Sequence, residues 1–158
     1  MFSQAIVRTP CKNLVNGITS ANLGKPNYTR ALSQHQHYID ALKQCGLNVT
    51  ILGPDEAYPD STFVEDTALV TPRCSIVTNP WAVSRKGEIE AIATVLNKLD
   101  RPVKRIEAPG TLDAGDVMMV GSHYYIGLSE RTNAEGARQL TAILNDHAMT
   151  GSIINMVW

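Results

Sequence analysis

The sequence predicts an α/β fold built from repeated units of two strands, a helix and a third strand. TALV, a Pro-Arg turn and CSIVTN form one predicted hairpin, and DVMMV, a Gly-Ser turn and YYIGL form another. A helical pattern and an apolar strand follow each hairpin. The aspartates that precede the hairpins, Asp66 and Asp116, are 50 positions apart. This spacing is typical of repeats arranged around a ring or along a stack.

We interpret the N-terminal part of the chain as a first, less complete unit. Residues 3–8 are strand-like, and residues 9–25 have the composition of a long loop. From about Tyr28 to Cys45, apolar residues recur at three and four positions, and Gly46 stands where a helix C-terminal glycine belongs. LNVTIL is then a strand, which a Gly-Pro pair ends.

The two later units each contain an amphipathic helix. The first of these helices carries its apolar residues on one face: Ile89, Ile92, Leu96 and Leu99. The second does the same with Leu140, Ile143 and Leu144. VKRIEA and GSIINMV are the strands that follow, and Asn133 is a suitable N-cap for the second helix. We therefore expect a single domain over residues 1–158, with modules at about 1–62, 63–108 and 109–158.

The composition excludes several classes of protein. The chain is 44% hydrophobic and 18% charged, which is typical of a globular protein. Its net charge is −1 and its basic residues are scattered, so it lacks the basic stripe that nucleic acid or an anionic membrane requires. The N-terminal residues MFSQAIVRTP have neither the basic nor the apolar region of a signal peptide, so we expect none. No apolar run approaches the roughly 18 residues of a membrane span. We expect a cytoplasmic protein with a small-molecule partner, and neither a nucleic-acid nor a membrane partner.

The cysteines predict neither a disulfide framework nor a zinc site. Cys11, Cys45 and Cys74 are odd in number and lack CxxC spacing, so we expect reduced thiols. Cys45 ends a predicted helix and Cys74 opens a predicted strand, so a structural role is the simpler interpretation for both. Cys11 lies in the N-terminal loop, and it is the only one of the three thiols for which the sequence leaves exposure open.

The histidines do not predict a ligand pair either. His35 and His37 are two positions apart on a predicted helix, so they face different directions. His123 falls in a predicted hairpin turn and His147 near a helix end, and surface roles suit both. We expect neither a metal nor another cofactor.

Charged side chains gather in the loops between the predicted elements. They include the acids Asp60, Glu65, Asp66 and Asp113 and the arginines Arg85 and Arg131. Taken one at a time, these are more simply read as solvated charges at strand ends and helix starts. In a radial repeat, however, the loops would converge, and the acids could bind a planar cation while the arginines bind a carboxylate. That combination suits an amino acid with a cationic side chain.

Five motifs, in order, resemble those of the dimethylarginine dimethylaminohydrolase family of the guanidino-modifying, or pentein, superfamily: RTPCKNLVNGITSANLGKPNY, YPDSTFVEDTALV, SRKGE, IEAPGTLDAGDVMMVG and YYIGLSERTNAEGA. The resemblance extends over the whole chain. It implies a five-bladed α/β-propeller of ββαβ modules, about three of which lie in these residues. It also implies hydrolysis of methylated arginine to citrulline and a methylamine, without a cofactor. An enzyme similar to arginine deiminase is the alternative within the same fold.

The resemblance implies roles for the charged residues of the loops. Asp66 matches the carboxylate that binds the guanidinium nitrogens of the substrate, and Glu65 and Asp60 match residues that assist in substrate recognition. Arg85 and Arg131 match the arginines that meet the amino-acid end of the substrate. These five residues form the expected substrate clamp.

Further expectations concern the lid loop and the reacting groups. Ile18 lies on the mobile lid loop, where the family often has leucine. Asp113 matches an acidic position, commonly glutamate, that supports the catalytic histidine. The histidine and the nucleophilic cysteine of the family have no counterpart here, so we expect the 158 residues alone to be inactive.

The C-terminal stretch IINMVW is an apolar strand without a polar cap. It predicts a homodimer or another association through an open edge. A non-catalytic binding or assembly module is therefore a second interpretation of the chain.

Overall fold

The computed structural model describes residues 2–155 and divides the chain into two compact units, Met1–Val64 and Glu65–Trp158. Each unit has its own sheet or sheets and is described by itself. The grouping of all residues into one domain of three modules stays a prediction.

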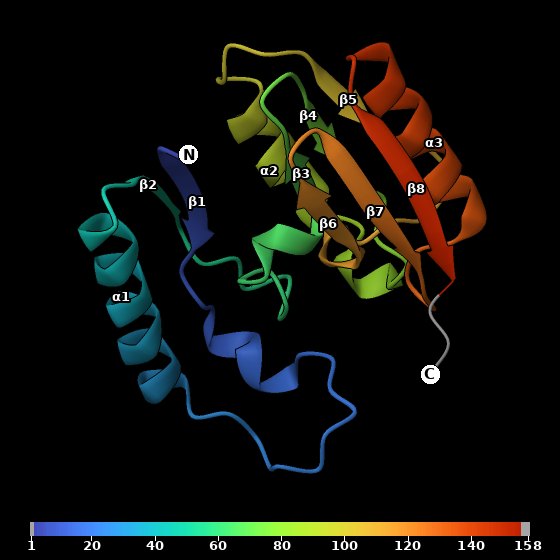
Figure 1. Cartoon of the computed structure of the whole chain (residues 1–158). Coiled ribbons are helices and arrows are strands. Elements are labelled where there is room, and N and C mark those ends of the chain that lie inside the picture. The colour runs from blue at the N-terminus through green and yellow to red at the C-terminus, as the bar shows by residue number, and fades with distance from the viewer. Residues whose placement is uncertain (1, 156–158) are drawn as a thin grey trace. The chain divides into compact units, whose positions relative to one another are not determined.

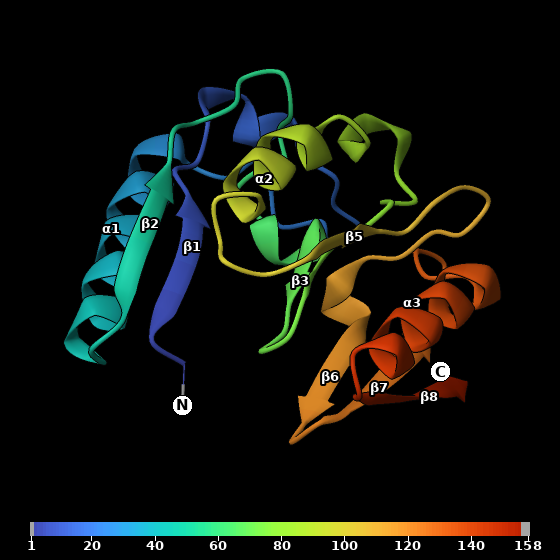
Figure 2. The same ribbon diagram turned by 90° about the horizontal axis from the view of Figure 1, so that it is seen from above.

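The first unit is a strand, a helix and a strand. β1 (Gln4–Arg8) and β2 (Asn48–Leu52) pair in parallel, which requires a crossover, and α1 (Tyr28–Gln44) supplies it. α1 contacts β2 and lies beside it in Figures 1 and 2. The side chain of Asn27 caps α1, and Gly46 ends it with a φ of 82°. The predicted strands and helix of this unit are confirmed.

The predicted loop of residues 9–25 contains a short helix that the sequence pattern did not indicate, η1 (Lys12–Asn16). The carboxylate of Glu56 accepts hydrogen bonds from the backbone N–H groups of Lys12 and Asn13, at 2.9 and 3.1 Å. These N–H groups at a helix start need partners, and here the partner is more than 40 residues away in sequence. Local sequence therefore carries no sign of this helix.

The predicted order of thiol exposure is wrong. Cys11 is buried, and its thiol lies 3.7 Å from the carbonyl oxygen of Tyr58 and 3.9 Å from that of Pro59. Cys45 is exposed because it follows α1, a helix whose only buried residue is Ile39. Cys74 is buried, as expected, and all three thiols are free.

The second unit contains two copies of the predicted ββαβ module, which are confirmed. In each copy the first two strands are antiparallel, and the third pairs in parallel with the second. The strand orders are β3-β4-β5 and β6-β7-β8. The bounds are β3 Ala68–Val70, β4 Ser75–Val77, α2 Glu88–Leu96 and β5 Val103–Arg105, then β6 Val117–Val120, β7 His123–Leu128, α3 Ala134–Asp146 and β8 Thr150–Asn155.

Three boundaries differ from the predictions. α2 ends at Leu96, and Leu99 follows in a tight turn, its N–H donating to the carbonyl of Leu96 at 3.0 Å. β5 is half as long as VKRIEA, because its partner β4 has only three residues. His123 is the first residue of β7 and pairs with Val120, so it lies in a strand and not in the hairpin turn where we expected it. The end of the last predicted strand, residues 156–158, lies outside the described residues.

The core of the second unit lies largely between α3 and the β6-β7-β8 sheet, which run side by side in Figure 1, and it extends to Cys74 and Ile76 of the first module. Leu140 and Leu144 are fully buried, as their spacing predicts, and Ile143 packs at the edge of the cluster. Tyr124 and Ile126 of β7 face them. No helix within the described residues is long and apolar enough to cross a membrane.

The packing of α3 generates a prediction at Gly136. A Cβ atom at this position would overlap the backbone carbonyl group of Thr111. Alanine normally stabilises a helix by about 1 kcal/mol relative to glycine, but we expect Gly136→Ala to destabilise the protein by about 1–3 kcal/mol, because the clash is with backbone. Thermal melting followed by circular dichroism measures the change. The control is Asn145→Ala, at an exposed position of the same helix, and a higher melting temperature for Gly136→Ala would contradict the packing.

Candidate functional site

A buried arginine lies at the centre of the charged residues of the second unit. η3 (Val83–Arg85) places Arg85 three residues before Glu88, in the first turn of α2. Nη1 of Arg85 donates to Oδ2 of Asp66 at 2.6 Å. Its Nε and Nη2 donate to the carboxylate of Glu88 at distances of 2.8 to 3.2 Å. One guanidinium therefore joins two carboxylates from different segments.

These hydrogen bonds keep Arg85 charged. Burial by itself would lower the pKa of Arg85, but the hydrogen bonds to Glu88 and Asp66 raise that pKa above its ordinary value. Breaking a buried ion pair by removing one partner costs roughly 3–5 kcal/mol, because the other charge is left without compensation. The three side chains therefore hold one another in place.

Asp66 is the most exposed member of this cluster. Its side chain is 16% exposed, against 5% for Arg85 and 4% for Glu88. η2 (Val64–Asp66) carries it, and Thr78 donates to its backbone oxygen at 2.8 Å. A Cβ atom on Gly115 would lie 2.7 Å from Oδ1 of Asp66, so only glycine leaves room for this carboxylate orientation.

Glu65 precedes Asp66 and has an exposed side chain at the start of the second unit. Partial desolvation raises the pKa of Glu65, and the negative charge of Asp66 raises it further. A backbone hydrogen bond and the charge of Arg85 oppose this rise in pKa. Glu65 is thus a second acid beside the exposed end of the cluster.

Asp113 is a buried carboxyl beside a half-exposed arginine. Its Oδ2 lies 3.8 Å from Nη1 of Arg131, and its Oδ1 is a buried oxygen without a hydrogen-bond partner among the described residues. Burial and the charges of Asp66 and Asp116 raise the pKa of Asp113 to about 6, against the lowering effects of Arg85 and Arg131. These four charged groups therefore lie within electrostatic range of Asp113.

Asp116 fixes the loop that carries Arg131. Its Oδ2 accepts hydrogen bonds from the hydroxyls of Ser129, at 2.7 Å, and Thr132, at 2.6 Å. Ser129 also accepts from the backbone N–H groups of Arg131 and Thr132. The sequence reasoning missed both hydroxyl residues, although a Ser and a Thr that flank an arginine are a signal for such a turn.

The first unit brings together two other predicted site residues. The carboxylate of Asp60 accepts the backbone N–H of Ile18 through both oxygens, at 3.0 and 3.2 Å. A Cβ atom on Gly17 would lie 2.6 Å from Oδ1 of Asp60, so the chain approaches this carboxylate closely. Asp60 is buried, whereas the Ile18 side chain is exposed. Asp60 therefore anchors one end of the predicted lid loop.

The position of Arg85 differs from that of an arginine exposed to a ligand. Its guanidinium is engaged by two carboxylates, whereas Arg131 has a side chain that is 53% exposed. The sequence analysis did not select Glu88, although the i, i+3 spacing of Arg and Glu in SRKGE is that of neighbouring residues on a helix.

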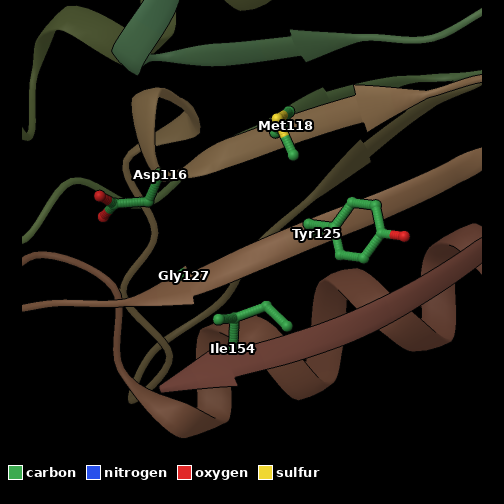
Figure 3. A pocket seen from close by; sticks show the side chains of 5 residues that line it. All are labelled: Asp116, Met118, Tyr125, Gly127 and Ile154. Atoms are coloured by element: carbon green, nitrogen blue, oxygen red, sulfur yellow. The ribbon is translucent and has the colours of Figure 1, made fainter. Parts of the chain in front are cut away.

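An open pocket of about 230 Å³ lies on the face of the β6-β7-β8 sheet away from α3. Figure 3 shows its lining residues on three neighbouring strands and the preceding turn: Asp116, Met118, Tyr125, Gly127 and Ile154. The lining is almost entirely apolar, which does not suit a cationic ligand. No three acidic, histidine or cysteine side chains of the described residues are arranged to hold a metal ion. The charged cluster around Asp66 is therefore the candidate site.

The raised pKa of Asp113 predicts a pH-dependent stability. An ordinary aspartate loses its proton near pH 3.8, whereas Asp113 in the folded protein keeps it to about pH 6. Between these values the folded state binds more protons than the unfolded state, so stability falls as pH rises from about 4 to about 6. Asp113→Asn removes this loss and should stabilise the protein at pH 7.5 by about 1–2 kcal/mol, after allowance for solvent screening near Arg131.

Urea unfolding at pH 4 and pH 7.5 measures this effect. At pH 4 the variant and the wild type should be almost equally stable. Asp116→Asn is the matched control in the same loop, and we expect it to lose stability at pH 7.5 because its carboxylate accepts two hydroxyl hydrogen bonds. Destabilisation of Asp113→Asn at pH 7.5 would mean that Asp113 is ionised and satisfied there.

Comparisons with known proteins identify the family. A family model described as N,N dimethylarginine dimethylhydrolase, eukaryotic, matches residues 16–152. The N(G),N(G)-dimethylarginine dimethylaminohydrolase of Pseudomonas aeruginosa is 56% identical over 99% of this chain, and the chain spans 62% of that relative's length.

Solved structures agree with this assignment. A cysteine-to-serine mutant of the Pseudomonas aeruginosa enzyme, complexed with citrulline, matches with a TM-score of 0.96 and 53% identity over 99% of this chain and 62% of the other. The N-terminal domain of ArgZ, a cyanobacterial arginine dihydrolase, matches with a TM-score of 0.84 and 17% identity over 97% of this chain and 58% of the other. The latter likeness concerns the fold alone, which is a mixed α/β fold in both proteins. By the family model and the identity to the Pseudomonas relative, this chain belongs to the dimethylarginine dimethylaminohydrolase family.

Proposed function

We propose that the whole protein hydrolyses Nω-methylated arginine to citrulline and a methylamine. The observation that carries this proposal is the carboxylate of Asp66, which Arg85 and Gly115 hold in one orientation at the exposed end of a buried ion-pair cluster. A fixed, partly desolvated carboxylate binds a guanidinium through charge-assisted hydrogen bonds. The family assignment and the citrulline complex of the Pseudomonas relative support the same substrate class.

The clamp has two ends in this proposal. Asp66 binds the guanidinium nitrogens, and the neighbouring Glu65 assists. The expected part of Asp60 in substrate recognition stays a prediction. Arg131 meets the carboxylate at the amino-acid end, because its side chain is half exposed. Arg85 holds the carboxylate of Asp66 in place through their direct ion pair.

The chemistry proposed for the whole protein begins with attack of a cysteine thiolate on the guanidinium carbon. The C–N bond to the methylated nitrogen then breaks, and a histidine gives that nitrogen its proton, so that methylamine leaves. Water then attacks the carbon of the remaining covalent intermediate and gives a proton back to the histidine, and the C–S bond breaks to release citrulline and the thiolate. Asp113 is proposed to hold the histidine, because its buried Oδ1 has no hydrogen-bond partner among the described residues and can accept from an imidazole N–H. Inactivity of the 158 residues alone, a homodimer and a cytoplasmic location stay predictions.

Turnover of dimethylarginine by the full gene product tests this proposal. Chromatography of the products distinguishes the alternatives. Citrulline with dimethylamine supports the proposal, and citrulline with ammonia from arginine supports a deiminase. If neither pair of products forms, the result supports a binding or assembly module. The same assay on residues 1–158 alone tests the prediction that they are inactive.

Asp66→Asn gives the residue-level test. The substitution removes one charge-assisted partner of the guanidinium, worth ~1.5–3 kcal/mol, so kcat/KM for dimethylarginine should fall by roughly 10- to 150-fold. Asp146→Asn, at the exposed end of α3, is the matched control and should leave kcat/KM unchanged. A folded Asp66→Asn variant with wild-type kcat/KM would refute the assignment of Asp66.

A further inference from the structure

Glu88 is a buried acid that neither the resemblance nor the proposed mechanism uses. Its side chain is 4% exposed, and it binds Nε and Nη2 of Arg85, so Nη1 is directed to Asp66. It lies in the first turn of α2, where the helix dipole stabilises a negative charge. The three ion-paired side chains carry one positive and two negative charges, a net charge of −1.

We propose that Glu88 is a positioning residue, which neutralises Arg85 so that the negative charge of Asp66 remains available to a cationic ligand side chain. The inference rests on the proposed function, because it takes Asp66 as the residue that receives the guanidinium. It assigns to Glu88 a role in substrate selection without contact between Glu88 and the substrate.

The argument follows from the charges and the exposure of the cluster. A pair made of Asp66 and Arg85 alone would be neutral, and an arriving cation would have to compete with Arg85 for the same carboxylate. Charges interact strongly where water is excluded, so the second carboxylate, from Glu88, restores a negative potential to the cluster. Asp66 is the end of the cluster with the most exposed side chain, so a ligand meets this potential there.

A purely structural role for Glu88 is the competing account. Glu88 and Arg85 tie α2 to the segment before it, and Asp66 ties both to η2. In that account, loss of Glu88 would disturb the site for every ligand alike. The two accounts therefore differ in how a ligand's charge affects its binding.

Arginine and citrulline separate the two accounts. They share the amino-acid end and the chain length, but the arginine side chain ends in a cationic guanidinium and the citrulline side chain in a neutral ureido group. We propose titration calorimetry of L-arginine and L-citrulline with the full gene product, with chromatography to confirm that arginine is not consumed. Glu88→Gln keeps the shape of the side chain and should weaken arginine binding about tenfold and citrulline binding less than about twofold.

Glu90→Gln is the matched control. Glu90 lies on the same helix and also pairs with an arginine, Arg105, at 2.9 Å, but its side chain is 70% exposed. This variant should bind both ligands as the wild type does. Glu88→Asp keeps the charge and should recover most of the arginine affinity.

Three outcomes would overturn the inference. Equal weakening of both ligands by Glu88→Gln means a structural role, and unchanged binding of both means no role. Wild-type protein that binds neither ligand overturns the proposed function, and the inference with it. If Glu88→Gln does not fold, Glu88→Ala decides: it also removes the charge and should weaken arginine binding more than citrulline binding, and equal weakening refutes the proposal.

Discussion

The buried guanidinium of Arg85 is the constraint on which the candidate site depends. A charge with so little solvent contact must be paired, and the structure pairs it with Asp66 on one side and Glu88 on the other. Each partner comes from a different segment, η2 and α2. The ion pairs therefore fix the segment before β3 against the start of α2, and the carboxylate of Asp66 takes one orientation.

The repeat of the ββαβ module explains why the acids occur where they do. A short helix precedes the first strand of both modules, and each ends in an aspartate, Asp66 in η2 and Asp116 in η4 (Ala114–Asp116). In the first module this carboxylate binds Arg85, whereas in the second it accepts two hydroxyl hydrogen bonds and orders the loop of Arg131. The aspartate at this position thus forms an ion pair in the first module and holds a loop in place in the second. Gly115 links the two aspartates, because it precedes Asp116 in the sequence and packs against the carboxylate of Asp66.

The sequence predicted those features that local pattern encodes. Helical spacing located α1, α2 and α3, turn residues located both hairpins, and Asn133 caps α3 through the N–H of Gly136 as expected. The order of the motifs, which no single charged residue conveys, also selected Asp66, Asp113 and Arg131 as site residues, and their roles stay predictions.

Features that depend on distant partners could not be predicted. η1 depends on Glu56, and the burial of Cys11 depends on the segment around Tyr58, both more than 40 residues away. The partners of Arg85 depend on the fold of two separate segments, and the pKa of Asp113 depends on charges brought together only in the folded unit. The exposure of a side chain and its ion-pair partners are properties of the tertiary structure, and the periodicity of apolar residues in the sequence does not predict them.

The central claim is that Asp66, held by Arg85, receives the side-chain end of the ligand. A crystal structure of the full gene product with bound citrulline tests it most directly. The account predicts the ureido group within hydrogen-bond distance of Asp66, with the Asp66–Arg85–Glu88 ion pairs unchanged and the ligand carboxylate toward Arg131. Citrulline bound elsewhere, for example in the apolar pocket beside Tyr125, with no contact to Asp66, would contradict it.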